Sequence, residues 1–401
     1  MISKEIVTYS LRSLVHRKTR NLLTILSIFI GIATIFVFVS FGLGLFSYVN
    51  SFTTGSSADK ITIMPKGLGA PGIDDTFSLN DTDIRAIEKA SGVYEATGMY
   101  SKAAQIKQSS ITKYIFLIGY DPDKPLIFEL SNMNVSKGRF LKAGDSGKVV
   151  LGHNYQIENK IFPKAYDLND EIEVQGKRLK IIGFMSEVGN PQDDSQIYVI
   201  NNYFGDLYTS KVSYSMAIAR VDTKNIRQVV ENVEKGLRNE RGLQKGKEDF
   251  FVQSFQEMLN TYMTALNVIV YFVLLIALIS VIVSAVNTAN TMVTSVLERT
   301  KEIGVIKSIG ARNSEVFKMF LFESGVLGLT GGIIGVILGF AFSSLAKKVL
   351  VSLGWSFLSP IFPWYLFAGC ILFATLTGAL SGAYPAWQAA KVRPVDALRY
   401  E

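Results

Sequence analysis

Cysteine and histidine are scarce in this sequence, and their scarcity excludes several kinds of site. The one cysteine, Cys370, lies inside an apolar stretch, so the rest of the chain offers no disulfide framework. The two histidines, His16 and His153, fall on opposite sides of the membrane in the topology predicted below. They therefore cannot share a metal ion or a catalytic site, and we predict no metal site and no catalytic residue.

A nucleotide-binding loop is also missing. The nearest candidate, residues 144–149, lacks the spacing of a Walker A motif and the Ser or Thr that should follow its lysine. Asp193 and Asp194 follow Pro191 and are typical of a surface turn rather than of a catalytic carboxylate pair. We therefore predict that the chain is not an enzyme and has no cofactor of its own, and that ATP and Mg²⁺ bind to a partner protein.

Charged residues are absent from four long apolar stretches. These are 22–46, 258–297, 324–346 and a part of 349–390 whose core is 364–384. Because about 20 helical residues cross roughly 30 Å of hydrocarbon, each stretch predicts a transmembrane helix. A helix through all of 258–297 would be about 60 Å long and would project beyond the membrane. Pro360 and Pro363 indicate a loop before the fourth helix, and Pro385 indicates its end.

Lysine and arginine outside these stretches predict the topology, because they concentrate in short cytoplasmic segments. The first 21 residues contain five of them, residues 289–318 contain five, and the tail from residue 388 contains three. We therefore expect a multi-pass protein of the plasma or inner membrane with both termini in the cytoplasm. The loop between the third and fourth helices has only Lys347 and Lys348, and an aromatic cluster follows it. This loop is predicted to lie outside.

The predicted fold class is a membrane protein with four transmembrane α-helices and an α+β extracytoplasmic domain inserted between the first two. The segments are a cytoplasmic amphipathic segment at 1–21, transmembrane helices at 22–46, 265–288, 319–346 and 363–385, the extracytoplasmic domain at 47–264, a cytoplasmic coupling segment at 289–318, an extracytoplasmic loop at 347–362 and a cytoplasmic tail at 386–401. A lobe inserted at about 125–205 is expected within the domain.

Inside residues 47–264, alternating and helical periodicities predict a folded α+β unit. Asn80 or Asp81 is expected to cap a first helix that ends near Gly92, and 224–237 forms a second helix. Strands are expected at 60–64, 104–106, 114–118, 149–151, 171–174, 179–182, 197–200 and 215–221. Residues 47–265 carry 26 basic and 27 acidic side chains, so the net charge of +7 comes from the rest of the chain. We therefore predict no nucleic-acid partner and attribute the positive charge to topology and lipid headgroups.

Residues 298–311 form the most distinctive segment, in which charged and apolar side chains alternate. Ile303 and Ile306 could form an apolar knob, framed by charges, on a short helix that docks into a groove on a soluble partner. Gly304 and Gly310 would permit sharp changes of direction. The alternative is a solvated loop that only joins two helices, and the local pattern leaves both open.

Glycines recur at helical spacing in the third and fourth apolar stretches. They are Gly328, Gly331, Gly332, Gly335, Gly339, Gly378 and Gly382. Small residues at this spacing let membrane helices approach closely, within one subunit or between two, although membrane helices are also generally rich in glycine. Glu323 is the carboxylate nearest to these glycines, and we expect it to snorkel or to pair with Lys318 rather than to relay protons.

Several of these segments together resemble the MacB/FtsX family of ABC transporter permeases. The matching parts are 17–24, 298–311, the glycine-rich third stretch, 384–398 with Pro385, Pro394 and Ala397, and the domain motifs at 138–140 and 149–152. The resemblance covers essentially the whole chain. It implies that the segment between the second and third helices contacts a cytoplasmic ATPase through Glu298, Arg299, Glu302, Ile303, Gly304 and Lys307.

The resemblance implies a permease subunit that acts with a separate cytoplasmic ABC ATPase and with a second permease copy, identical or related. It would export a hydrophobic or peptide substrate, with an extracytoplasmic adaptor as a further partner and lipid around its helices. The alternative is an FtsX-like scaffold that signals to extracytoplasmic enzymes without transport. A transporter driven by an ion gradient would need ionisable residues buried at mid-span, and the four stretches supply none beyond Glu323.

Overall fold

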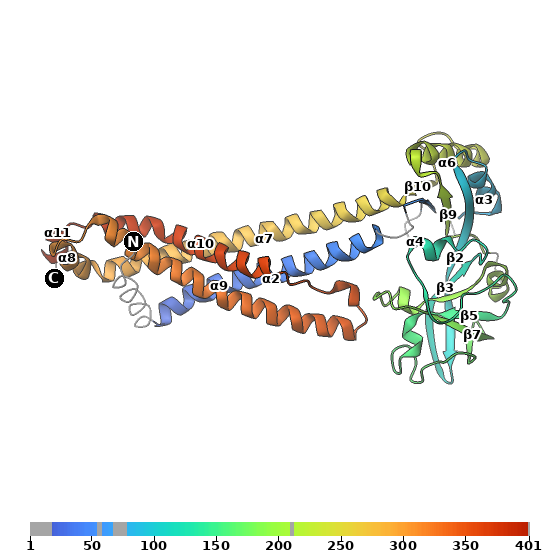
Figure 1. Ribbon diagram of the computed structural model, residues 1–401, viewed down its shortest axis with the longest axis horizontal. Helices are drawn as coiled ribbons and strands as arrows, with labels where there is room; N and C mark the ends of the chain where they lie inside the picture. The colour runs from blue at the N-terminus through green and yellow to red at the C-terminus, as the bar shows by residue number, and fades with distance from the viewer. Residues whose placement is uncertain (1–17, 54–57, 67–77, 209–211, 400–401) are drawn as a thin grey trace. The chain divides into compact units, whose positions relative to one another are not determined.

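The computed structural model describes residues 18–53, 58–66, 78–208 and 212–399. His16 and most of the predicted amphipathic segment 1–21 lie outside the described residues. The chain separates into two compact units. The helical unit comprises Met1–Leu45, Leu266–Val349 and Leu358–Glu401, and the domain unit comprises Phe46–Ala265 and Leu350–Phe357 (Figure 1).

Four long helices dominate the helical unit. They are α2 (Lys18–Thr53), α7 (Phe255–Glu298), α9 (Asn313–Ser352) and α10 (Trp364–Lys391), and two short helices, α8 (Thr300–Ser308) and α11 (Pro394–Arg399), accompany them. Within the described residues, these four long helices have the length and hydropathy needed to cross a membrane. This confirms the four transmembrane helices that the charge-free stretches predict.

The ends of the helices differ from the limits of the apolar stretches. α9 begins at Asn313, so its first turns include the charged residues Glu315 and Lys318. α10 runs through Pro385 to Lys391, and the prediction that Pro385 ends this helix is therefore wrong. A proline removes one backbone hydrogen bond. Here the residue itself and the alanines after it, such as Ala389, are buried, and this packing holds the helix together.

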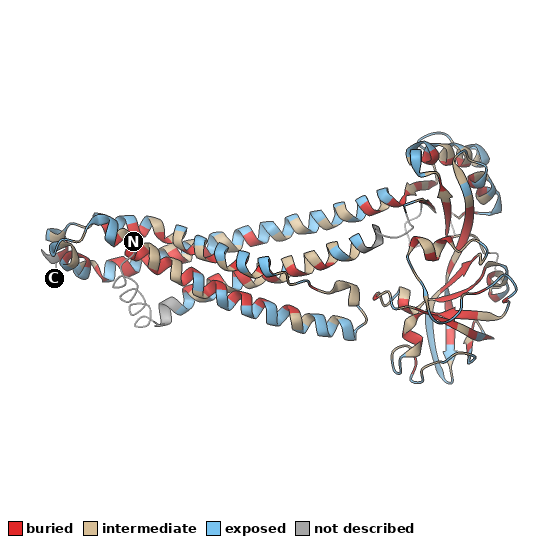
Figure 2. Ribbon diagram, in the orientation of Figure 1, coloured by how far each residue is buried: buried red, intermediate tan, exposed pale blue. Residues whose placement is uncertain are grey.

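Burial is distributed unevenly among the long helices (Figure 2). In the most apolar window of α9, 39% of the residues are buried within this chain, whereas the corresponding share for α7 is 6%. α7 contacts α2 through polar groups: Thr24 and Thr291 share a hydrogen bond of 2.7 Å, and Asn287 Nδ2 donates to Ser27 Oγ at 3.0 Å. The greater part of the α7 surface is thus apolar and faces away from the rest of the helical unit.

The domain unit is built on one mixed sheet, as the α+β prediction requires. Its strands are β1 (Lys60–Pro65), β2 (Val93–Gln108), β3 (Ile111–Tyr120), β4 (Val135–Gly138), β5 (Lys148–Leu151), β6 (Glu171–Val174), β7 (Lys177–Met185), β8 (Ile197–Ile200), β9 (Met216–Val221) and β10 (Phe250–Ser254). The order is β10-β1-β9-β2-β3-β8-β5-β7-β4, with β6 paired to β2 and β7. β4 and β10 were not expected from the sequence.

Two helices cover the β10-β1-β9-β2 end of this sheet. They are α3 (Asp81–Glu88) and α6 (Ile226–Arg241), and their apolar sides share a core with the strands around Ile61 and Val233. Asn80 caps α3 as expected: its side chain accepts from the backbone N–H of Asp83, whose carboxylate accepts from the Asn80 N–H. Gly92 then turns the chain at a φ of 93°, a conformation that favours glycine.

A second core fills the other end of the sheet. It includes Ala104 and Ile106 of β2 and Leu117 of β3 together with Val149 and Phe184. The lobe expected at about 125–205 therefore shares its core with β2 and β3, because the long β2–β3 hairpin runs through both ends of the sheet. The short helices α4 (Leu126–Leu130) and α5 (Asn201–Phe204) connect its strands.

The connection between α9 and α10 packs on the domain unit. Phe357 N–H donates to the Gly189 carbonyl at 3.2 Å, and Ser356 Oγ donates to the Glu187 carboxylate at 2.9 Å. Lys160 Nζ donates to the Ser352 carbonyl at 3.0 Å. Part of the predicted loop 347–362 is therefore a structured piece of the domain.

Candidate functional site

The junction between α7 and α8 is organised by Arg299. The backbone of this residue is not helical, so it separates the two helices. The whole residue is only 3% exposed. Nη1 donates to Glu323 Oε2 at 3.1 Å, and Nε donates to Glu302 Oε2 at 3.0 Å. The guanidinium also lies over the ring of Phe320, 5.5 Å from its centroid. One buried cation thus connects α7, α8 and α9.

Glu323 is the buried partner of this cation. Its side chain is 5% exposed, whereas that of Glu302 is 55% exposed. The expectation that Glu323 snorkels or pairs with Lys318 is wrong. Arg299 lies 24 residues away in the chain, and the bend between α8 and α9 brings it to Glu323. A buried charge is costly unless it is paired, so each of these two residues stabilises the other.

α8 itself is fixed to the chain on one side. Ile303 is 1% exposed and belongs to an apolar core with Met292, Val316 and Phe320. It therefore does not project from the chain as the knob that the sequence suggested. Gly304 is buried inside the helix and makes no change of direction, because α8 continues to Ser308.

The other side of α8 is open. Val305 is 43% exposed and Ile309 is 83% exposed. Gly310 then turns the chain toward α9 at a φ of 109°, a conformation that favours glycine. This confirms the change of direction predicted at this residue. The exposed apolar residues of this segment are therefore Val305 and Ile309 rather than Ile303, from which the sequence analysis built the apolar knob.

Lys307 connects α8 to the end of α10. Its Nζ donates to the carbonyls of Ala390 at 3.0 Å and of Val392 at 2.6 Å. These carbonyls belong to the last turn of α10, where a cation also interacts favourably with the helix dipole. α11 packs beside α8 and includes the buried Ala397. The structure thus brings the 298–311 and 384–398 segments together.

The six predicted coupling residues differ in burial. Arg299, Ile303 and Gly304 are buried and hold α8 in place, and Lys307 is half-buried. Glu298 and Glu302 are exposed. Sequence reasoning missed Glu323 as a member of this site, because its contact with Arg299 depends on the packing of α7, α8 and α9 and has no local pattern.

The predicted glycines lie at helix contacts within this chain. A Cβ at Gly335 would lie 2.8 Å from the Phe29 carbonyl oxygen of α2, and Gly331 and Gly339 face α2 as well. Gly328 and Gly332 face α10 on the neighbouring side of α9, and Gly378 and Gly382 of α10 face α9. α9 therefore carries two glycine faces, each of which permits close approach of another helix.

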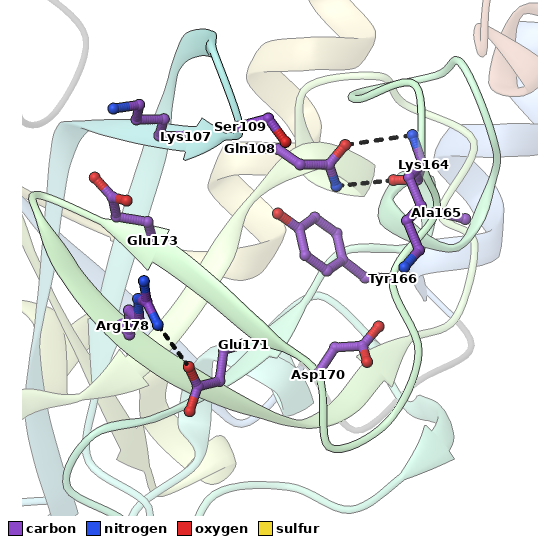
Figure 3. A pocket seen from close by; sticks show the side chains of 10 residues that line it. All are labelled: Lys107, Gln108, Ser109, Lys164, Ala165, Tyr166, Asp170, Glu171, Glu173 and Arg178. Atoms are coloured by element: carbon purple, nitrogen blue, oxygen red, sulfur yellow. Dashed lines mark hydrogen bonds and ion pairs between the residues drawn. The ribbon is translucent and has the colours of Figure 1, made fainter.

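The domain unit contains a polar cavity of about 410 Å³ at the β2–β3 and β6–β7 turns (Figure 3). Gln108 holds its wall by donating to the Lys164 carbonyl at 3.0 Å and accepting from the Lys164 N–H at 3.3 Å. Tyr166 faces the same space, with Glu171 and Arg178 4.0 Å apart on β6 and β7. Its lining mixes both charge signs, so it favours no single class of ligand.

Asp193 and Asp194 lie in a short 3₁₀ turn before β8. Asp194 is 3% exposed and accepts from the backbone N–H groups of Val188 at 2.8 Å and Gly189 at 2.9 Å. The prediction of a surface turn is therefore wrong for Asp194, which instead braces the preceding loop. Burial raises the pKa of Asp193, and the charge of Asp194 raises it further.

Two family models match this sequence. A MacB-like periplasmic core domain matches residues 21–235, and the C-terminal part of an FtsX-like permease matches residues 274–394. An ABC transporter permease of Methanocaldococcus jannaschii is 30% identical, with 99% of this chain and 98% of that protein covered. The ABC transporter permease YknZ of Bacillus subtilis is 24% identical, with 99% of each chain covered.

A third relative is longer than this chain. The macrolide export ATP-binding/permease protein MacB of Neisseria gonorrhoeae is 28% identical, and the match covers 97% of this chain but 60% of that protein. Among solved structures, the periplasmic region of MacB from Actinobacillus actinomycetemcomitans gives a TM-score of 0.42 at 16% identity. That match covers 52% of this chain and 94% of the other.

Proposed function

This chain belongs to the ABC transporter permeases of the MacB/FtsX type, and we propose that it couples ATP hydrolysis by a separate cytoplasmic ATPase to movement of its domain unit. In this proposal the termini and α8 face the cytoplasm, and the domain unit lies outside. The charge asymmetry between the segments supports this orientation. The match to a MacB-like core domain favours export of a hydrophobic or peptide substrate over signalling alone.

The observation that carries the proposal is the two-sided construction of α8. One side is fixed to α7, α9 and α10 through Arg299, Ile303 and Lys307, while the opposite side exposes Val305 and Ile309. A partner that binds the exposed side would therefore move three membrane helices through buried contacts. Short amphipathic helices that dock into grooves use this arrangement of apolar anchors.

A second permease copy is the proposed partner of α7. The most apolar window of this helix has 6% of its residues buried within the chain, and its surface carries large apolar side chains such as Tyr271, Phe272 and Leu278. Such a surface needs lipid or another apolar helix around it. We propose that two copies, identical or related, pair along α7 and receive two ATPase subunits.

The test replaces the exposed anchors, because a charge at the buried Ile303 would unfold the junction and report nothing about the partner. Val305→Glu and Ile309→Glu should leave membrane insertion and thermal stability unchanged. Each should weaken co-purification with the ATPase and reduce ATP turnover in the complex by about tenfold or more, since each loses a buried apolar contact of about 1.5–3 kcal/mol.

Ile157→Glu is the matched control, because Ile157 is 42% exposed in the domain unit and receives the same charge. It should retain ATPase binding and turnover. The proposal is refuted if the Val305→Glu/Ile309→Glu double variant binds the ATPase and hydrolyses ATP like the unmodified protein.

A further inference from the structure

A second cavity in the domain unit, of about 330 Å³, differs in character from the one in Figure 3. We call it the inner cavity. Its walls come from four parts of the sequence: the end of α2, the middle of β2 and β3, α4 with the residues that follow it, and the loop that precedes β8 together with Tyr198 of that strand. These parts are separated by up to about 150 residues in the chain, and the cavity exists only in the folded domain.

Large apolar side chains form one part of the wall. Met99 of β2, Phe116 and Ile118 of β3, Met133 and Tyr198 all line the inner cavity. Sites for small molecules are usually concave and mostly apolar, with a few fixed polar groups, and occupy about 300–1,000 Å³. Methionines add adaptability, because an unbranched thioether side chain fits ligands of different shapes. The inner cavity therefore suits a small ligand with an apolar body.

One carboxylate lies on this wall. Asp193 is held by two neutral amides: Asn190 Nδ2 donates to one oxygen and Gln196 Nε2 donates to the other, each at 3.0 Å. Gln196 in turn accepts from the hydroxyl of Tyr198 at 2.9 Å. The amides fix the orientation of the carboxylate but do not neutralise its charge.

The neighbourhood of Asp193 adds negative charge rather than cancelling it. The buried Asp194 follows it directly, and that carboxylate accepts from backbone N–H groups. Glu187 raises the pKa of Asp194, and His153 is the nearby basic side chain that lowers it. No lysine or arginine forms an ion pair with either residue in the part of the chain that the structure describes. The raised pKa of Asp193 has the same origin, in burial beside a second carboxylate. A positively charged group would relieve this imbalance.

We propose that the inner cavity binds a small organic cation, with its ammonium group against Asp193 and its apolar body between Phe116, Met133 and Tyr198. The inference rests on the proposed function, since it names a class of ligand for the exporter. Charge complementarity excludes anions, and the volume excludes large ligands from full enclosure.

The inner cavity adjoins residues 350–357 of the α9–α10 connection, which belong to the domain unit. Val188 and Gln192 of its wall belong to the loop that the α9–α10 connection holds, through the bond from Phe357 N–H to the Gly189 carbonyl. The ring of Phe357 also packs on that of Tyr48, a wall residue, at 5.1 Å between centroids. Displacement of this connection would change the shape of the cavity and release its ligand.

The experiment uses the full chain in lipid nanodiscs without any ATPase. Dansylcadaverine, a fluorescent primary amine, is titrated beside its neutral N-acetyl derivative, and the signal from empty nanodiscs is subtracted. A charge-assisted hydrogen bond to Asp193 should make the amine bind about tenfold more tightly than the neutral dye. Asp193→Asn should abolish this preference, whereas Asp170→Asn, on the exposed rim of the Figure 3 cavity, should keep it.

Ser131→Phe supplies a second variant, because Ser131 lines the inner cavity and is only half-buried. Its larger side chain should fill the space and weaken both dyes. Equal affinity for the two dyes in the unmodified protein would overturn the proposal. An amine preference that Asp193→Asn leaves unchanged would also overturn it, and so would an affinity for both dyes that Ser131→Phe leaves unchanged. Because no ATPase is present, any of these outcomes would leave the proposed coupling function untouched.

Discussion

Replacement of Glu323 by glutamine should destabilise the helical unit far more than the same change at Glu302. Both carboxylates accept from Arg299, but the Glu323 side chain is 5% exposed and that of Glu302 is 55% exposed. Removal of one member of a buried ion pair costs about 3–5 kcal/mol, because it leaves the other charge buried without compensation. An exposed pair contributes about 0–1 kcal/mol.

We expect Glu323→Gln to cost about 3 kcal/mol, at the low end of that range, because glutamine still accepts a hydrogen bond. At about 2–4 °C per kcal/mol this lowers the melting temperature by about 6–12 °C. Glu302→Gln should lower it by about 4 °C at most. The double variant Arg299→Met/Glu323→Leu should be more stable than Glu323→Gln, because it leaves no uncompensated charge.

The assay uses the single cysteine of the chain. Cys370 is 6% exposed inside α10, so a fluorogenic maleimide reacts with it only when the helical unit opens on heating. If Arg299 joins three helices, loss of its buried partner Glu323 must lower the melting temperature more than loss of its exposed partner Glu302. Equal melting temperatures for Glu323→Gln and Glu302→Gln would refute this reasoning, as would a double variant that melts below Glu323→Gln.

Three further predictions concern single positions. Gly335→Ala should lower the melting temperature in the maleimide assay, because its Cβ would meet the backbone of α2 at 2.8 Å, whereas Gly369→Ala, a helical position with nothing within 4 Å, should not. Asn80→Ala should cost about 1 kcal/mol of domain stability in chemical unfolding, since the α3 cap is lost, and no change would contradict the capping contacts. Arg139 holds the pKa of the Asp145 carboxyl below its usual range. The ionised carboxylate therefore stabilises the domain above about pH 4, and this stabilisation is lost as the pH falls through the lowered pKa. Acid unfolding of Asp145→Asn should therefore depend less on pH below about 4, and an unchanged acid profile would argue against this account.

Much of the architecture can be predicted from the sequence because the features that determine it lie within short stretches of the chain. A charge-free run of more than 20 residues has few alternatives to a membrane helix, and Asn80 with Asp83 specifies a capped helix within four positions. The helix ends are less predictable. α10 passes through Pro385 because burial of the following alanines outweighs one lost hydrogen bond, and no local pattern reports that packing.

The coupling site shows a different limit of sequence reasoning. An isoleucine in an amphipathic pattern must be covered, but the pattern does not say whether its own chain or a partner covers it. Ile303 is covered by this chain, while Ile309 is left open. Glu323 was assigned to the nearest cation in sequence, Lys318, because its partner Arg299 is brought close only by the bend between α8 and α9.

The two glycine faces of α9 determine which changes in helix length the protein can tolerate. Insertion of one residue between Gly332 and Gly335 would rotate everything beyond it by about 100°, so that Gly335 and Gly339 would no longer face α2 and side chains would meet its backbone instead. Removal of seven residues, about two turns, would nearly preserve the phase. We therefore expect length variation among functional variants to be confined to whole turns in α9.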